Sequence, residues 1–163
     1  MHIKLVNSSS DIRNVASLGN EVFGGYYKTL LGEEQTNYMV DKFLSKKAIK
    51  NNISEGFVYY LINNEEQNIG FIALQYRPAF LYISKCYIKE EYRGQGNFKV
   101  IFNMIRALCY KHNYKSIKLN VNKHNDLAIN VYEHVGFTRE SSETINIGNG
   151  FYMDDYVYEY QIK

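Results

Sequence analysis

The sequence EEYRGQGNFKV, at residues 90–100, places two glycines between an apolar run and an amphipathic one. The run FLYISKCYI (80–88) is typical of a strand, and residues 97–112 have the spacing of a helix. Glycine allows a sharp bend, and the N–H groups that begin a helix lack internal partners and attract anions. The segment therefore predicts an α/β fold with an anion site at Gly94 and Gly96, although a tight turn without a ligand could use the same glycines.

Two common phosphate motifs do not fit this turn. A P-loop would continue as Gly-Lys-Ser or Gly-Lys-Thr, whereas residues 96–98 read Gly-Asn-Phe. A dinucleotide fingerprint would have a third glycine and an acidic residue closing the next strand. We expect neither of these two nucleotide sites.

Composition limits the kind of protein. The chain has 163 residues, of which 45% are apolar, so we expect a single domain over 1–163 with its own core. The net charge of +2 gives no basic excess for a nucleic-acid partner. Residues 1–14 contain no long apolar segment, so we expect neither a signal peptide nor a membrane span.

Cysteines and histidines give no sign of a metal site. Cys86 and Cys109 have neither metal-type spacing nor the number typical of a disulfide framework, so free thiols in a reducing cytoplasm are expected. His112, His124 and His134 form no metal-binding motif. The sequence predicts a cytoplasmic protein that needs no metal.

Hydrophobic periodicity predicts the order of the elements. Strand-like runs lie at 2–6, 57–62, 69–76, 80–88 and 116–121, and on both sides of the GNG at 148–150. Helical runs begin near residue 9 and lie within 36–53, 97–112 and 125–136, with Ser45 as an internal cap and Gly136 as a terminator. The segment GGYYKTLLGEE (24–34) reads as irregular or as a short helix. This order predicts a mixed sheet in which a crossover helix joins a parallel pair of strands.

A second group of residues lies in LNVNKHNDLAINVYEHVGF (119–137). Asn125, Ala128 and Tyr132 are spaced along one face of a helix, with a small residue between two hydrogen-bonding side chains. Such a stripe leaves room for a thin ligand. A lone tyrosine on an amphipathic helix could equally pack against a sheet.

Together, the two segments resemble the GNAT family of N-acetyltransferases. The family motif Arg/Gln-x-x-Gly-x-Gly/Ala falls on residues 93–98, and Asn125, Ala128 and Tyr132 precede Gly136-Phe137 as they often do in the family. The resemblance is strongest over residues 68–138. The ending GNGFYMDDY resembles a bacterial subgroup and, faintly, polyamine acetyltransferases.

The resemblance implies an acyl-CoA N-acyltransferase (GNAT) fold of the α/β, or α+β, class. That fold has a mixed, mostly antiparallel sheet, a parallel pair splayed for coenzyme A, and about four flanking helices. It also implies acetyl-CoA as co-substrate and an amine as acceptor. The coenzyme-binding residues that it implies are Cys86, Tyr87, Ile88, Arg93, Gly94, Gln95, Gly96, Asn97, Phe98 and Asn125.

Each part of the donor has an expected position. The pyrophosphate is expected on the N–H groups of residues 94–98, and the pantetheine arm beside the backbone of residues 86–88, with Asn125 on its other side. An N–H of Tyr87 or Ile88 would polarise the thioester carbonyl. Phe98 stands where the family has Gly or Ala, so we expect its ring to turn away from the pyrophosphate.

The acceptor chemistry needs a base and an acid. Tyr132 is placed, by resemblance, to protonate the thiolate that leaves, and a phenol with a reference pKa near 10 suits that step. Candidate bases are Glu21, Glu33, Glu34, Asp154 and Asp155. The last two are favoured, and at most one of them faces the site because neighbouring strand residues point to opposite faces. Tyr26 and Tyr27 could form an acceptor lid, or could be ordinary packing residues.

The expected activity is direct acetyl transfer to a primary amine, with a small amine or polyamine favoured. A peptide N-terminus or lysine is the alternative acceptor. A non-catalytic coenzyme A-binding regulator with the same fold is a second alternative, and Phe98 is the main argument for it. No membrane or nucleic-acid partner is expected, and a homodimer is left open.

Overall fold

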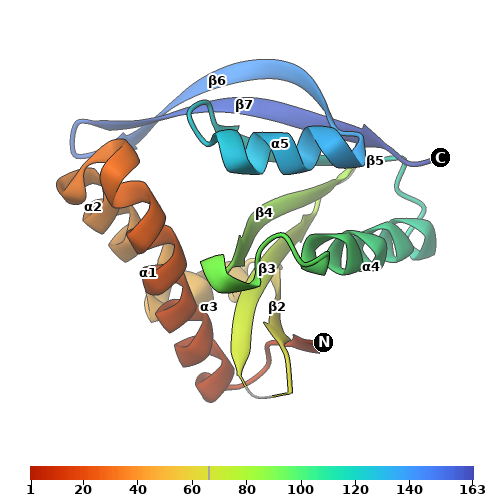
Figure 1. Cartoon of the computed structure of the whole chain (residues 1–163), viewed down its shortest axis with the longest axis horizontal. Coiled ribbons are helices and arrows are strands. Elements are labelled where there is room, and N and C mark those ends of the chain that lie inside the picture. Colours follow the sequence, from red (N-terminus) through yellow and green to blue (C-terminus); the bar gives the residue numbers. More distant parts are fainter. Residues whose placement is uncertain (66) are drawn as a thin grey trace. The chain divides into compact units, whose positions relative to one another are not determined.

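The computed structural model describes residues 1–65 and 67–163 (Figure 1). The predicted polar turn NNEEQN includes residue 66, which lies outside the described residues. The helices are α1 (Ser9–Leu31), α2 (Glu33–Leu44), α3 (Lys46–Ser54), η1 (Glu90–Tyr92, a 3-10 turn), α4 (Asn97–Lys111) and α5 (Asp126–Val135). The strands are β1 (His2–Leu5), β2 (Val58–Asn63), β3 (Asn68–Tyr76), β4 (Leu81–Ile88), β5 (Ser116–Asn122), β6 (Thr138–Gly148) and β7 (Phe151–Gln161).

The chain forms two compact units that interleave in sequence. Unit 1 consists of Met1–Gln75 and Lys85–Phe98, and unit 2 consists of Tyr76–Ser84 and Lys99–Lys163. The chain passes from one unit to the other at three points, which fall within β3, β4 and α4. The expectation of a single domain over the whole chain stays a prediction.

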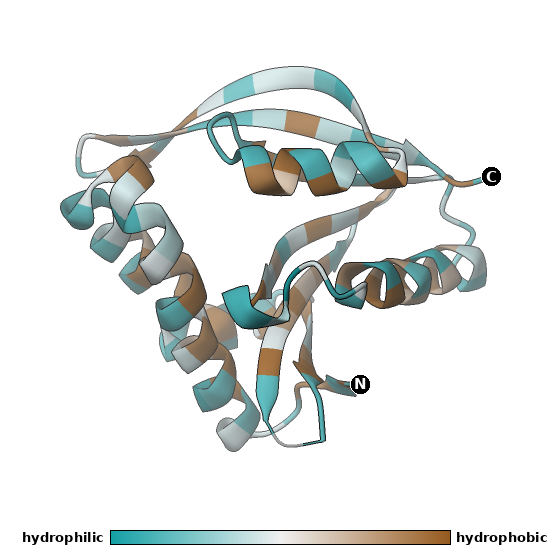
Figure 2. Cartoon of the chain, in the orientation of Figure 1, coloured by the Kyte–Doolittle hydropathy of each residue, from teal (hydrophilic) through white to brown (hydrophobic). Residues whose placement is uncertain are grey.

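Unit 1 combines an antiparallel meander with three helices. β1 pairs with β2 and β2 with β3, both antiparallel, with Ile3 opposite Ile62 and Tyr59 opposite Ala73. β3 is buried along most of its length, and Figure 2 shows it as a largely apolar ribbon. The side chain of Phe71 at its centre has no exposed surface.

Two helices of unit 1 begin at serine caps, and the cap at Ser45 was predicted. Ser8 caps α1 through its hydroxyl, which accepts from Asp11 N at 3.1 Å, and Ser45 caps α3 by accepting from Ala48 N at 3.2 Å. The prediction that residues 24–34 are irregular or form a short helix is wrong at its start, because α1 continues without a break to Leu31. Buried packing of Val22, Phe23 and Tyr27 outweighs the weak helix propensity of the two glycines between them.

Unit 2 contains the start of β4 and the strands β5, β7 and β6, in that order. The β4–β5 pairing is parallel, as predicted, and it joins Leu81–Ile83 to residues 117–119. β5 pairs with β7 and β7 with β6, both antiparallel, and the β6–β7 connection runs through Asn149, as the GNG predicted. Among the strand pairings that the described residues form inside the two units, β4–β5 alone is parallel, so the arrangement is mixed and mostly antiparallel.

An aromatic cluster forms part of the core of unit 2. The ring of Phe102, on α4, meets Phe137 at 5.6 Å and Tyr160 at 4.9 Å between centroids. On α4, Val100 is 50% exposed although it is apolar, whereas Phe102 and Cys109 are buried. Helix α5 ends at Gly136 in the left-handed conformation (φ 110°), as predicted, and in Figure 2 apolar and polar bands alternate along it.

Hydropathy of the helices is moderate. None of the helices formed by the described residues is both long enough and apolar enough to cross a bilayer. All five α-helices alternate between buried and exposed positions, which is typical of helices that cover a sheet or each other.

Candidate active site

The glycine turn of unit 1 has the conformation that its sequence predicts. Gly94 and Gly96 have φ values of 70° and 78°, in the left-handed region where other residues are strained. The side-chain amide of Asn97 donates to the Tyr92 carbonyl at 2.8 Å, and that of Gln95 donates to the Glu91 carbonyl at 2.8 Å. Hydrogen bonds from its own side chains therefore stabilise the turn, directly before the 15-residue helix α4.

Arg93 stands beside the turn as an exposed cation. Its Nε donates to the Ile88 carbonyl at 2.9 Å, and its guanidinium carbon lies 6.0 Å from the ring centroid of Tyr26. Its terminal nitrogens have no hydrogen bond to any residue that the structure describes. This arrangement holds the guanidinium near the end of β4 and leaves donors for an anion.

Phe98 is the second residue of α4 and is half-buried. Part of its ring surface is thus covered by protein. Its backbone belongs to the first turn of the helix, where N–H groups have no acceptor four residues earlier within the helix. The expectation that the ring turns away from a pyrophosphate stays a prediction.

The segment Cys86–Ile88 forms the end of β4, and all three residues are half-buried. Burial raises the pKa of the Cys86 thiol to about 12, so this cysteine has little thiolate at neutral pH and is not an activated nucleophile. The ring of Tyr87 meets Phe23 and Phe71 edge-on, at 5.8 and 5.4 Å between centroids. The side chain of Tyr87 is therefore a packing element of unit 1.

Gly70, on β3, lies against the backbone of Tyr87 and Ile88 and leaves no room for a side chain. A Cβ atom there would collide with the carbonyl oxygen of Tyr87 and would lie 3.1 Å from the Cα of Ile88. The Lys89 N–H donates to the Ile69 carbonyl at 2.9 Å. The close approach of the two strands thus fixes the backbone of β4 where the donor is expected.

Tyr26 and Tyr27 lie in α1, not in an irregular segment. Tyr27 is buried and stacks on Phe23 at 4.4 Å between centroids. Tyr26 is half-buried, edge-on to Tyr27 at 5.0 Å and near the guanidinium of Arg93. Of the two, Tyr26 is the better placed to meet a ligand.

In unit 2, Asn125 and Tyr132 belong to α5, as predicted. Asn125 is the N-cap, and its Oδ1 accepts from Ala128 N at 3.2 Å. Its side-chain oxygen is therefore engaged in the helix start. Tyr132 is half-buried, and its ring meets Phe137 edge-on at 5.7 Å.

The neighbouring carboxylates Asp154 and Asp155, on β7, have opposite environments. Asp154 forms an ion pair with Lys123 at 2.8 Å and accepts from the Thr144 hydroxyl at 3.2 Å. The hydrogen bond from Lys123 lowers the pKa of Asp154. Asp155 is only 7% exposed, and burial raises its pKa to about 6.

A polar network adjoins Asp155 on the same sheet. Asp155 is opposite Glu143 on β6 and Asn122 on β5. The Asn120 amide donates to Glu143 at 3.0 Å, and its Oδ1 accepts from the Tyr82 hydroxyl at 3.0 Å. A hydrogen bond from Asn120 opposes the rise in the Asp155 pKa, and the charge of Glu143 adds to it.

The sequence patterns do not predict the roles of Tyr82, Asn120 and Glu143. The alternation of SIKLNV does indicate that Asn120 faces away from the buried Leu119 and Val121, so one signal was available. The other two residues depend on which strand pairs with which, and a single sequence does not give that.

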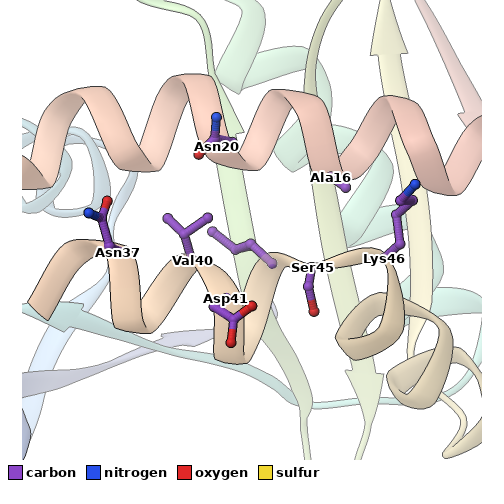
Figure 3. Close-up of a pocket in the computed structure, with 8 residues that line it drawn as sticks. Ala16, Asn20, Asn37, Val40, Asp41, Ser45 and Lys46 are labelled. Carbon is purple, nitrogen blue, oxygen red and sulfur yellow. The ribbon is translucent and has the colours of Figure 1, made fainter. Parts of the chain in front are cut away.

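One pocket lies away from the predicted site residues. A shallow pocket in unit 1 is lined by Ala16, Asn20, Asn37, Val40, Asp41, Leu44, Ser45 and Lys46 (Figure 3). Within the described part of the chain, no group of three His, Cys, Asp or Glu residues is arranged to hold a metal ion.

Comparison with known proteins identifies the family. A family model described as "Acetyltransferase (GNAT) domain" matches residues 28–154. No curated protein matches the chain significantly. Many solved structures do match.

Two solved structures illustrate the match. PaiA N-acetyltransferase from Thermoplasma acidophilum, in complex with coenzyme A, superimposes with a TM-score of 0.82 at 20% identity, covering 99% of both chains. The ribosomal-protein-S18-alanine N-acetyltransferase from Escherichia coli superimposes with a TM-score of 0.74 at 15% identity, covering 99% of this chain and 94% of that one. At these identities the likeness shows the fold.

The family match covers most of the chain, and the glycine turn lies within it at the start of α4. The chain therefore belongs to the GNAT family and is an acetyl-CoA-dependent N-acetyltransferase.

Proposed function

We propose that the chain transfers the acetyl group of acetyl-CoA to a small primary amine, with a polyamine as the favoured class. The observation that carries the proposal is the turn before α4, where two glycines at positive φ and the cation of Arg93 surround the helix start. Backbone N–H groups and a guanidinium are the donors that a pyrophosphate requires.

Residues of unit 1 bind the donor in this proposal. Gly94–Phe98 and Arg93 hold the pyrophosphate, and the backbone of Cys86–Ile88 pairs with the pantetheine arm. An N–H of Tyr87 or Ile88 stabilises negative charge on the thioester oxygen. In unit 2, Asn125 is the further proposed pantetheine contact.

Residues of unit 2 act as the base and the acid in this proposal. We assign the base to Asp155, because a carboxylate with a pKa near 6 can accept a proton at neutral pH better than one held by a lysine. Asp154 stays bound to Lys123 and has no proton role. Tyr132 protonates the departing thiolate.

A cross-strand pair of acids favours a cationic acceptor. Glu143 and Asp155 face each other in the β6–β7 register, and like charges in such a pair repel. A bound ammonium group relieves that repulsion and orients the amine. Tyr26 is the proposed lid residue, and Tyr27 supports it from the core of unit 1.

The test is an assay of coenzyme A thiol release with matched acceptors. Diamines, spermidine and spermine form one arm, and peptides with free N-termini or lysines form the other. We expect the polyamine arm to have the higher kcat/KM, and Asp155→Asn to lower it more than Asp154→Asn. A preference for peptides would move the chain to the peptide or protein class, and acetyl-CoA binding without any release would make it a non-catalytic binding protein.

A further inference from the structure

Asn120 lies at the centre of the polar network of unit 2. It is on β5 and is half-buried. Its side-chain oxygen accepts from the Tyr82 hydroxyl on β4 at 3.0 Å, and its side-chain nitrogen donates to Glu143 on β6 at 3.0 Å. A further hydrogen bond joins it to Asp155 on β7. One amide therefore contacts side chains from three other strands.

The Tyr82 hydroxyl fixes which way this amide points. An amide accepts hydrogen bonds at its oxygen and donates them from its nitrogen. Because Tyr82 donates to the oxygen, the nitrogen faces the two acids, and a reversed amide would set its oxygen against their carboxylates. Burial raises the pKa of Tyr82 to about 12, so the hydroxyl keeps its proton and stays a donor throughout the neutral range.

The two acids beside the amide have no cationic partner of their own. Among the residues that the structure describes, no lysine, arginine, histidine or amino-terminal nitrogen lies within 4.0 Å of the carboxylates of Glu143 and Asp155. Lys118, on the same strand as the amide, pairs with Glu140 instead, at 2.9 Å. The amide thus holds two acids together without neutralising them.

The surroundings of Asp155 act on it in both directions. Burial is the largest influence and raises its pKa to about 6, and the charges of Glu143 and Asp154 raise it as well. The hydrogen bond from Asn120 and the charge of Lys123 lower it. A hydrogen bond to a carboxylate favours the ionised form. The amide therefore favours the form of Asp155 that can accept a proton, although a second acid lies beside it.

We propose that Asn120 is a positioning residue for the acceptor: it holds Glu143 and Asp155 as a paired acidic site that receives the ammonium group of a cationic amine. The inference rests on the proposed function, in which Asp155 is the base. The ammonium gives one proton to the Asp155 carboxylate and becomes the neutral nucleophile, while the charge of Glu143 attracts the acceptor. Asn120 exchanges no proton, and Tyr82 acts on the site only through the amide.

The first experiment measures the protonation of Asp155 without any substrate, by carbon-13 NMR titration of its side-chain carboxyl. Asn120→Ala should raise the midpoint by about one pH unit relative to the wild type, because the carboxylate loses a hydrogen bond. Tyr82→Phe keeps the ring and removes the hydroxyl, so it should raise the midpoint by less, and it decides the question if Asn120→Ala does not fold. Glu140→Gln, which breaks the ion pair with Lys118 on the same sheet, is the control and should leave the midpoint unchanged.

Steady-state kinetics with spermidine give the second readout. In Asn120→Ala, the acidic limb of the kcat/KM profile should move upward together with the NMR midpoint. At pH 8 the KM for spermidine should rise about fivefold, whereas kcat should change less than about twofold, because the residue orients the acceptor and takes no part in the chemistry.

The outcomes separate the two proposals. A loss of folding stability in Asn120→Ala without a shift of the midpoint would show a merely structural role and overturn the inference. An unmoved midpoint in both variants, with a wild type that acetylates spermidine, removes this inference alone. No acetylation of spermidine by the wild type removes the proposed polyamine function, and this inference with it.

Discussion

Units 1 and 2 differ in the kind of candidate functional residue that each of them contains. In unit 1 the contribution is mainly backbone: the glycine conformations of the turn at 94–96 and the end of β4, with Arg93 as a permanent cation. In unit 2 the contribution comes from side chains whose charge depends on their surroundings, above all Asp155 and its neighbours Asn120 and Glu143. Under the proposed function, donor binding thus depends on the backbone conformation of unit 1, and proton transfer depends on the burial of side chains in unit 2.

The two adjacent aspartates show the same contrast within one strand. Asp154 is held by an external lysine, and its pKa falls; Asp155 loses contact with water, and its pKa rises to about 6. Identical side chains one residue apart thus differ in their protonation near neutral pH. Position in the sheet, rather than residue type, decides which of them can act as a base.

The largest effect is expected at Tyr132. Tyr132→Phe removes the proton donor and should lower kcat about 100-fold, a usual size for general acid catalysis. The Kd for acetyl-CoA should change less than twofold, because the ring and its contact with Phe137 remain. Steady-state kinetics and calorimetry measure the two quantities. Equal kcat in the variant would remove Tyr132 from the mechanism.

The pH dependence of stability tests Asp155. Its folded-state pKa of about 6 lies above the unfolded value near 3.8, so the folded chain holds the proton more tightly. Stability from this group is therefore lost as the pH rises from about 4 to 6, by on the order of 2–3 kcal/mol. Asp155→Asn should lack that loss. Its unfolding free energy, compared with that of the wild type by urea unfolding at each pH, should therefore be more favourable at pH 7 than at pH 4.5.

Asp154→Asn is the matched control for this experiment. Because the pKa of Asp154 is lowered, its contribution has the opposite sign: it is present at neutral pH and lost as the pH falls. Relative to the wild type, the unfolding free energies of the two variants should therefore change in opposite directions as the pH rises. Parallel pH profiles for the two variants and the wild type would show that burial of Asp155 has no such effect.

Gly70 tests whether the backbone of β4 is held by close strand contact. Gly70→Ala places a Cβ against the Tyr87 carbonyl and should cost about 2 kcal/mol of unfolding free energy, as overpacking does. Gly25→Ala, in α1 with open space around the new Cβ, is the control and should be neutral or slightly stabilising. Urea unfolding gives both values, and equal stabilities would mean that β4 moves aside freely.

The turn itself should show a smaller effect. Gly96→Ala at φ 78° strains the backbone by roughly 1–2 kcal/mol. Part of that strain should appear as a Kd for acetyl-CoA about tenfold higher, without a change in the pH profile of turnover. A changed pH profile with an unchanged Kd would contradict the proposal, because it would link Gly96 to proton transfer rather than to donor binding.

Local signals in the sequence predicted the parts of the fold that are locally determined. Ser45, Asn125 and Gly136 begin or end helices where expected, and Gly94 and Gly96 make the predicted bend, with positive φ values. The parallel pairing of β4 with β5 followed from the crossover helix between them. These features need only neighbouring residues or a strong topological rule.

Features set by distant packing could not be predicted in the same way. α1 continues through Gly24 and Gly25 because its buried face holds it in place, and Val100 is exposed despite its apolar side chain. The environment of Asp155 depends on residues far away in the chain, such as Asn120 and Glu143. A single sequence does not reveal those contacts.

The most direct test of the account is calorimetric titration of the wild-type chain and of Gly96→Ala with acetyl-CoA. The account predicts saturable, one-to-one binding in the micromolar range for the wild type and about tenfold weaker binding for the variant. Such a result would show that the turn accepts a pyrophosphate with Phe98 in place. No binding to the wild type, or equal affinity in both proteins, would contradict the assignment of the turn as the donor site.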